Sequence, residues 1–188
     1  MKPILFNTDM VQAILEGRKT VTRRVVKPQP DGQPVLMGED SCWPGYFAIQ
    51  GTEKVIRPPY QPGDILWVRE TWSPVAVRPK RFIYKADVAR GRGEGVGLPI
   101  RWHPSIHMPR EAARIFLRVT GVRVERLDDM TTDDVFMEGV FPTSTFEHIR
   151  DRWHQVWNST IKPKDRITYG WEANPWVWVI EFERISKP

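Results

Sequence analysis

Apolar residues near the N-terminus follow first a helical and then a strand period. The spacing predicts a short helix over residues 8–17, with Thr8 or Asp9 as N-cap and Gly17 as the left-handed residue that ends it. The next segment, 19–26, is rich in β-branched residues and predicts a strand. The apolar face of the helix consists of Met10, Val11, Ile14 and Leu15.

Alternation with a period of two marks the longer strands. The clearest case follows the turn Gly63-Asp64, where residues 65–70 alternate. Residues 81–86 predict another strand, and residues 113–127 predict a long one with a bulge or bend at Gly121. The chain closes with an alternating strand within 174–185 that is buried on at least one face.

Two further helices are predicted between the last two strands. In 131–139, Thr131 and Asp134 are spaced as a capping box, and Gly139 ends the helix. In 144–158, Ser144 and Glu147 have the same spacing. The apolar stripe of this second helix consists of Phe146, Ile149, Trp153 and Val156.

Proline and glycine concentrate in two long stretches, which read as insertions at about 28–60 and 73–110. Within the first, only 46–50 and 54–56 have strand character. The order of helix, strands, helices and strand predicts one α+β domain over 1–188, built on a curved sheet or β-barrel with flanking short helices.

Composition narrows the class of protein. Apolar residues make up 40% and charged residues 27% of the chain, which is typical of a globular domain and excludes a disordered chain. The net charge of +5 favours a polyanionic partner, and the nine tryptophans suit both core packing and base stacking. With a single cysteine, Cys42, and no apolar run approaching about 20 residues, we expect a cytoplasmic protein that does not enter a membrane.

Several kinds of site lack support in the sequence. His103 and His107 are four residues apart, but Pro104 argues against the helix that would align them on a metal, so we expect no metal site and no cofactor. The glycine-rich stretch 91–97 lacks the strand, helix and Lys-Ser/Thr pair of a phosphate loop. No serine occupies a nucleophile elbow.

The cluster EGRKTVTRR, residues 16–24, is the first candidate site. In a regular strand, Lys19 and Arg23 share one face while Thr22 and Arg24 share the other. Lys19 and Thr22 could converge if Lys19 belongs to the turn after Gly17. Two interpretations stay open: a functional cleft, or an edge strand whose charges discourage aggregation.

Glu138 is the second candidate. It lies in the last turn of a predicted short helix, where the helix dipole disfavours an anion. A carboxylate in this position either finds a cation or holds its proton more tightly. The alternative is a solvated glutamate at a frayed helix end.

Several motifs, taken together, resemble the ASCH domain, a PUA-like β-barrel family associated with RNA. These are ILEGRKTVTRR, PGDILWVRETW, a helix that ends in MEG, and the closing WVWVIEFER. The wider sequence, including WHPSIHMPREAARIFLRVTGVRVERL, is similar to the subgroup often encoded by bacteriophages and prophages. The resemblance covers most of the chain in order and implies a PUA-like fold with the two insertions.

The resemblance also implies a chemistry. Some small bacterial members of the family are amidohydrolases that deacetylate N4-acetylcytidine with a Lys, a Thr and a Glu, which fall on Lys19, Thr22 and Glu138. A threonine hydroxyl needs a base to take its proton, and a neutral lysine amine can serve. Neighbouring cations would favour the neutral amine of Lys19, and Glu138 could pass the proton to the leaving amine.

Other polar and aromatic residues complete the predicted site. Arg69, Glu70 and Trp72 come where a barrel strand would reach its rim, a common place for base-binding side chains. We therefore predict that RNA or a modified nucleoside binds a basic cleft, with or without hydrolysis. The alternatives are a ribonuclease, a non-catalytic RNA-binding module and a phage-encoded protein-interaction module. The predicted binding residues are Arg18, Arg23, Arg24, Arg69, Glu70, Trp72, Trp102 and His103.

Overall fold

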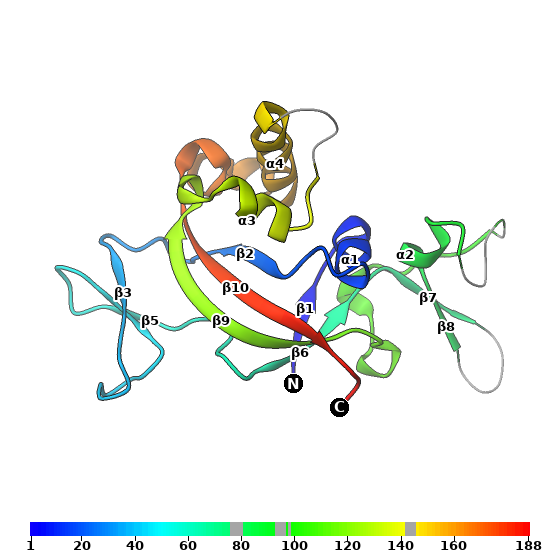
Figure 1. Ribbon diagram of the computed structural model, residues 1–188, viewed down its shortest axis with the longest axis horizontal. Helices are drawn as coiled ribbons and strands as arrows, with labels where there is room; N and C mark the ends of the chain where they lie inside the picture. The colour runs from blue at the N-terminus through cyan, green and yellow to red at the C-terminus, as the bar shows by residue number, and fades with distance from the viewer. Residues whose placement is uncertain (76–80, 93–96, 98, 142–145) are drawn as a thin grey trace. The chain divides into compact units, whose positions relative to one another are not determined.

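The computed structural model describes residues 1–75, 81–92, 97, 99–141 and 146–188 (Figure 1). The chain forms two compact units, each with its own strands and helices. Strands β9 (Phe116–Arg126) and β10 (Trp176–Ile185) run from one unit into the other. Unit 1 comprises Met1–Lys19, Asp64–Arg118 and Glu183–Pro188; unit 2 comprises Thr20–Gly63 and Val119–Phe182.

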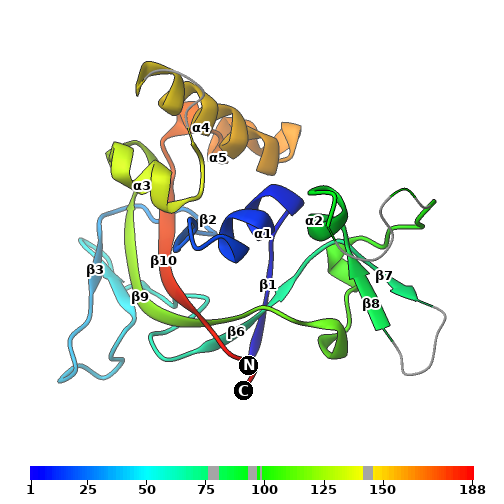
Figure 2. The same cartoon turned by 45° about the vertical axis from the view of Figure 1, so that its right-hand side comes forward.

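Unit 1 is built on a short sheet and a hairpin. Strand β1 pairs in parallel with β6, and β6 pairs antiparallel with the start of β9. Strands β7 and β8 form the hairpin that Figure 2 shows in green. The elements of unit 1 are β1 (Lys2–Leu5), α1 (Thr8–Leu15), β6 (Ile65–Arg69), β7 (Trp72–Val75), β8 (Arg81–Tyr84), α2 (Lys85–Val88), η1 (Ser105–His107) and η2 (Arg110–Ala112).

Helix α1 shows how local sequence sets an element. Its N-cap is Asn7, whose side-chain oxygen accepts the Met10 N–H at 2.9 Å, so the prediction of Thr8 or Asp9 as N-cap was wrong. The helix buries Val11 and Ile14, and it ends before Gly17, which has a positive φ of 75°. The end of the helix is therefore where the sequence predicted it.

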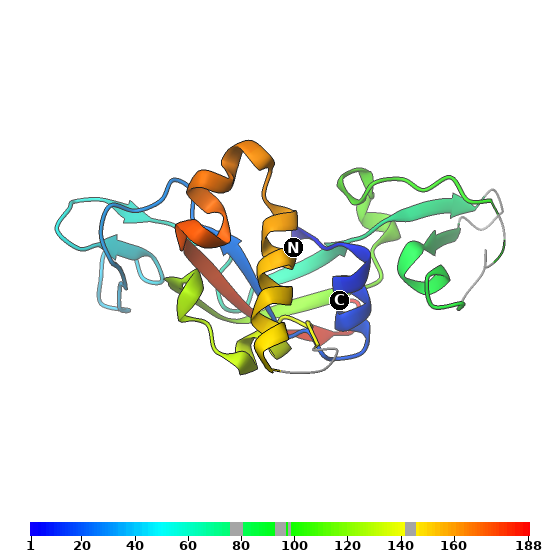
Figure 3. The same cartoon turned by 90° about the horizontal axis from the view of Figure 1, so that it is seen from above.

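Unit 2 carries the longer helices. Strand β2 pairs antiparallel with β10, with Thr22 opposite Ile180, and β3, β4 and β5 form a small antiparallel sheet. Figure 3 shows α4 in gold and the orange segment that follows it. The elements of unit 2 are β2 (Val21–Val25), β3 (Pro34–Leu36), β4 (Phe47–Ile49), β5 (Val55–Ile56), η3 (Leu127–Asp129), α3 (Thr132–Met137), α4 (Phe146–Thr160), η4 (Pro163–Asp165), α5 (Arg166–Tyr169) and η5 (Trp171–Ala173).

Two predictions for the long elements changed. Strand β9 continues through Gly121, where an added Cβ would lie 2.8 Å from Glu181 Oε2, so this glycine permits a close approach of Glu181. In α4 the buried residues include Ile149, Trp153 and Trp157, whereas the predicted Val156 is half-buried. The predicted cap at Ser144 lies outside the described residues, and the side chains of 146–148 are not described.

The fold is mixed α+β, with a multistranded sheet and short helices. The described strands do not close into a barrel, so the closed-barrel form of the prediction is not seen. None of the described helices is long and apolar enough to cross a membrane. Among the same residues there is no cluster of three His, Cys, Asp or Glu side chains that could hold a metal ion.

Candidate functional site

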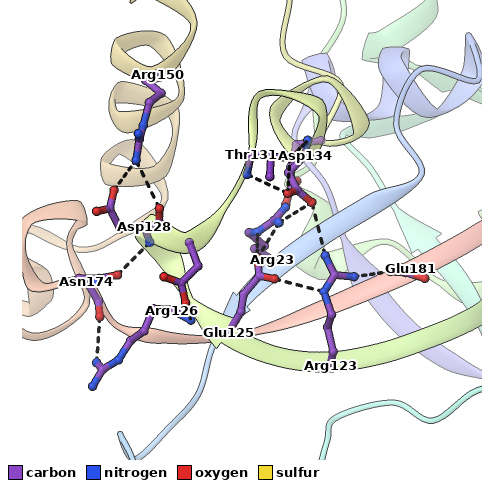
Figure 4. A network of polar contacts seen from close by, with 12 residues as sticks. Arg23, Arg123, Glu125, Arg126, Asp128, Thr131, Asp134, Arg150, Asn174 and Glu181 are labelled. Atoms are coloured by element: carbon purple, nitrogen blue, oxygen red, sulfur yellow. Dashed lines mark hydrogen bonds and ion pairs between the residues drawn. The ribbon is translucent and has the colours of Figure 1, made fainter. Parts of the chain in front are cut away.

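A buried arginine of unit 2 is bound by three carboxylates. The Arg23 side chain is 0% exposed, and its Nε and Nη2 donate to Glu125 Oε1 at 2.9 and 2.6 Å. Nη2 lies 2.9 Å from Asp134 Oδ1, and Nη1 lies 3.4 Å from Glu138 Oε1. This cluster joins β2, β9 and the two ends of α3 (Figure 4). Because its donors are directed at carboxylates, the guanidinium is placed to organise the site and not to contact RNA.

Electrostatics keep this cluster ionised. Burial disfavours the Arg23 cation, but the charges of Glu138 and Glu125 and the hydrogen bond to Asp134 outweigh that cost and raise its pKa. Burial likewise disfavours the Asp134 anion, but hydrogen bonds from Thr131 and Arg23 lower its pKa. The Thr131 N–H and hydroxyl donate to Asp134 Oδ2 at 2.8 and 2.7 Å, which completes the predicted capping box.

Glu138 is the C-cap residue of α3. Its backbone N–H donates to the Asp134 carbonyl at 2.9 Å, and the next residue, Gly139, has a φ of 81°. The side chain is buried, although it lies at the end of a helix that disfavours an anion. Of the two fates expected for such a carboxylate, the structure shows the first, since Arg23 lies 3.4 Å away.

The opposite face of β2 carries Thr22 and Arg24. Thr22 is buried and lies opposite Ile180, while Arg24 is half-buried and lies opposite Trp178. Burial lowers the pKa of Arg24, and the opposing charges of Glu138 and Tyr60 act to raise it. An arginine remains a cation even so, and β2 therefore sets a buried hydroxyl and a partly accessible positive charge two residues apart.

Arg123 extends the charged cluster along β9. Its Nε donates to Glu125 Oε2 at 3.1 Å, its Nη2 approaches Asp134 Oδ1 at 3.4 Å, and its Nη1 pairs with Glu181 of β10 (Figure 4). Glu125 and Asp134 are thus each shared between two arginines. Shared carboxylates of this kind hold the strand and the start of α3 in one arrangement.

Lys19 belongs to unit 1 and is described there. Its side chain is buried, its backbone N–H donates to the Ala13 carbonyl at 3.1 Å, and its Nζ lies 5.5 Å from the centroid of the Phe6 ring. Lys19 therefore belongs to the turn after α1, as one interpretation of the sequence required. Its role with Thr22 and Glu138 stays a prediction, because those two residues belong to unit 2.

Glu70 of unit 1 is held by an arginine. Its two carboxylate oxygens accept from Arg114 Nε and Nη2 at 2.9 and 3.0 Å, and Arg114 Nη1 donates to Asp87 at 2.6 Å. The guanidinium also lies 3.9 Å from the centroid of the Tyr84 ring. Burial raises the pKa of Glu70 against the lowering effect of Arg114, and burial raises the pKa of Tyr84 to about 12.

The other predicted binding residues of unit 1 have partners within that unit. Arg18 pairs with Glu16, and Arg69 donates to the Ile106 carbonyl and lies 5.4 Å from the Trp67 ring. Trp72 is buried against Phe82.

The structure brings Trp72 and His103 together. Their backbones exchange hydrogen bonds of 3.3 and 2.8 Å, and their rings lie 5.1 Å apart. Trp102 is half-buried beside His103 in the chain.

Sequence analysis missed several contributors. Glu125 and Arg123 alternate along β9, and this pattern marks a charged strand face but not the cation that Glu125 meets. Asp134 was predicted as a capping residue only, and Arg114 was not predicted. Tyr60 stands in the Pro-rich stretch, where no periodic pattern indicated that it would lie near Arg24.

Comparisons with known proteins add no family. No protein family model and no curated protein matches the chain. Among solved structures, the chain is similar to protein EF3133 from Enterococcus faecalis V583, described under the family model DUF984. The match has a TM-score of 0.46 and 9% identity, and covers 99% of this chain and 82% of that one. A similarity this weak says nothing about function.

Proposed function

We propose that this protein binds RNA or a modified nucleoside at a polar site of unit 2 formed by Thr22, Arg24, Tyr60 and Glu138. The observation that carries the proposal is the face of β2, where a buried hydroxyl and a half-buried guanidinium lie two residues apart. Glu138 and Tyr60 are both close enough to Arg24 to act on its charge. The sequence resemblance to the PUA-like ASCH family supports the same class of ligand.

Each residue has a distinct role in this proposal. The Arg24 guanidinium offers charge and hydrogen-bond donors to a phosphate or a base carbonyl. Tyr60 offers an aromatic surface to a base, and Glu138 accepts from an amino group. Arg23 orients Glu138 from the opposite side of the strand, where it is held by Glu125 and Asp134.

The reaction to test is hydrolysis of an N4-acylcytidine. The Thr22 hydroxyl would attack the acyl carbonyl, forming an ester as the bond to the exocyclic nitrogen breaks. Lys19, assigned from the sequence, would accept the hydroxyl proton, and Glu138 would deliver a proton to the leaving amine. Water would then hydrolyse the ester to release the carboxylic acid and restore Thr22.

Incubation with N4-acetylcytidine, followed by chromatography of released cytidine, tests this reaction. We expect turnover by the wild type and its loss in Thr22→Ala and Lys19→Ala, by about 100-fold or more. Thr20→Ala is the matched control, because Thr20 is an exposed threonine beside the same strand. Equal turnover in Thr22→Ala and Thr20→Ala would contradict the nucleophile assignment.

The outcome with no turnover also discriminates. If the wild type releases no cytidine but binds RNA with an affinity that falls as salt rises, the protein is a non-catalytic RNA-binding protein. If it neither releases cytidine nor binds a nucleoside or RNA, the proposed function is wrong.

A further inference from the structure

Unit 2 carries a second group of aromatic rings, and each of these rings lies beside a cation. Lys27 Nζ lies 4.6 Å from the centroid of the Tyr169 ring, and the Arg126 guanidinium lies 4.4 Å from that of Trp176. The Arg150 guanidinium lies 5.9 Å from that of Trp171. We call these six residues the aromatic–cation surface. The three rings are half-buried, so each keeps part of its area accessible.

Hydrogen bonds join two of these pairs into one structure. Arg126 Nη1 donates to the Asn174 carbonyl at 3.0 Å, and the Asn174 side-chain oxygen accepts the Asp128 N–H at 2.8 Å (Figure 4). Arg150 in turn donates to the Asp128 carbonyl at 3.3 Å. Asn174 adopts a left-handed conformation with φ of 42°, which turns the chain between η5 and β10. The surface is therefore fixed by its own backbone contacts.

Helix α4 supports the aromatic rings from below. The Asn158 side-chain oxygen accepts the Trp171 N–H at 3.0 Å, and Trp157 Nε1 donates to the Tyr169 carbonyl at 2.9 Å. The His154 ring stacks on Trp171, with centroids 5.7 Å apart and planes 28° from parallel. Rings held in this way lose little freedom when a ligand stacks on them.

The charge around the rings favours an anionic partner. The segment 162–169 exposes three cations, Lys162, Lys164 and Arg166, against the single carboxylate of Asp165. Ile167, in the middle of this segment, is 90% exposed. A guanidinium that lies over a ring still directs its N–H groups outward in its own plane, where phosphate oxygens can accept them.

We propose that the aromatic–cation surface binds single-stranded RNA outside the site at Thr22. Bases would stack on Tyr169 and Trp171, and phosphates would meet Lys27, Arg150 and the cations of 162–169. Base-paired RNA does not fit this chemistry, because its bases are already stacked. The inference rests on the proposed function only in the choice of RNA as ligand. Trp176 is two residues from Trp178, the strand partner of Arg24, so the two sites follow each other along β10.

The test uses the whole protein and a fluorescein-labelled oligouridylate of about 12 nucleotides, with affinity measured by anisotropy over a range of salt concentrations. We expect Trp171→Ala to weaken binding by roughly tenfold or more at every salt concentration. The double variant Lys164→Gln/Arg166→Gln should weaken it mainly at low salt and reduce the salt dependence by about 0.7 per lost phosphate contact.

Matched variants separate this surface from general effects of substitution. Trp43→Ala removes another tryptophan of unit 2, 54% exposed, and should leave affinity unchanged. Trp171→Phe should keep most of the affinity, because it retains a ring that can stack. Circular dichroism of each variant identifies any that fail to fold, and the charge variant at exposed positions keeps the test valid in that case.

The outcomes distinguish this inference from the proposed function. Oligouridylate binding that is lost in Trp171→Ala but kept in Trp43→Ala supports the aromatic–cation surface. Binding that Arg24→Gln weakens and that neither the Trp171 nor the charge variant affects overturns the inference and leaves the proposed function standing. No binding of oligouridylate by the wild type also overturns it, and cytidine release from N4-acetylcytidine then decides the proposed function alone.

Discussion

The two units solve the problem of a partly buried arginine in different ways. In unit 2, the fully buried Arg23 meets three carboxylates, from Glu125, Asp134 and Glu138. In unit 1, the Arg114 side chain is 26% exposed, meets two carboxylates and lies over an aromatic ring. Water supplies part of the solvation of Arg114, whereas protein groups must supply nearly all of it for Arg23.

The acidic partners differ in the same way. Hydrogen bonds from Thr131 and Arg23 lower the pKa of Asp134, which is held mainly at the edge of its cluster. Burial raises the pKa of Glu70, because its one arginine does not repay the loss of water. The comparison teaches that the number of donors around a buried carboxylate, and not the presence of an ion pair, decides the direction of its pKa.

The largest effect should come from removing the buried cation. Arg23→Gln leaves Glu138 and its neighbours without their shared guanidinium, and we expect unfolding to become easier by about 3–5 kcal/mol. Urea denaturation measures this change. Arg23→Lys, which keeps the charge but not the fork of donors, should recover part of the loss. A change below about 1 kcal/mol for Arg23→Gln would show that the cluster does not stabilise unit 2.

The same substitution in unit 1 should cost less. We expect Arg114→Gln to lower the free energy of unfolding by about 2 kcal/mol, because water can reach the groups that it leaves behind. Lys54→Gln serves as the control, since the Lys54–Asp31 pair is 64% and 63% exposed and should contribute well under about 1 kcal/mol. A cost for Arg114→Gln that equals that of Arg23→Gln would remove the contrast between the units.

The two carboxylates should give opposite pH dependences. The lowered pKa of Asp134 contributes stability above its unfolded value of about 3.9, which is lost as the pH falls through the native pKa. The raised pKa of Glu70 has the opposite sign: its protonated form favours folding below about pH 4.3, and this contribution is lost as the pH rises through the native pKa.

Urea titrations between about pH 3 and pH 8 test both signs. Compared with the wild type, Asp134→Asn should lose the least stability in acid, so that the gap between them narrows as the pH falls. Glu70→Gln should gain on the wild type as the pH rises above about 4.3. Parallel curves for all three proteins would show that neither pKa is shifted by folding.

How far the sequence predicts the molecule depends on the distance between the interacting residues. Alternation located β6 and β10, and the Thr131–Asp134 capping box is local and was found. The partners of Arg23 lie 102 and 115 residues away for Glu125 and Glu138, and no local pattern connects them. The short β1 was missed because four residues carry too little periodicity to mark a strand.

The candidate site was predicted less completely than the elements that hold it. Residue type and spacing singled out Thr22, Arg24 and Glu138, which unit 2 contains, but gave no sign that Tyr60 would join them. They also grouped Glu70 with these residues, although Glu70 is committed to Arg114 in unit 1. Strand alternation tells which face a side chain occupies, but the partner on that face comes from tertiary packing.

The most direct test of the central claim is calorimetric binding of cytidine 5′-monophosphate to the wild type, Arg24→Gln and Arg69→Gln. If the ligand site lies in unit 2 on the face of β2, Arg24→Gln should weaken binding by roughly tenfold or more, through loss of charged hydrogen bonds. Arg69→Gln, in unit 1, should bind within about twofold of the wild type. Loss of binding in Arg69→Gln with full binding in Arg24→Gln would contradict the assignment, as would a wild type that does not bind the nucleotide.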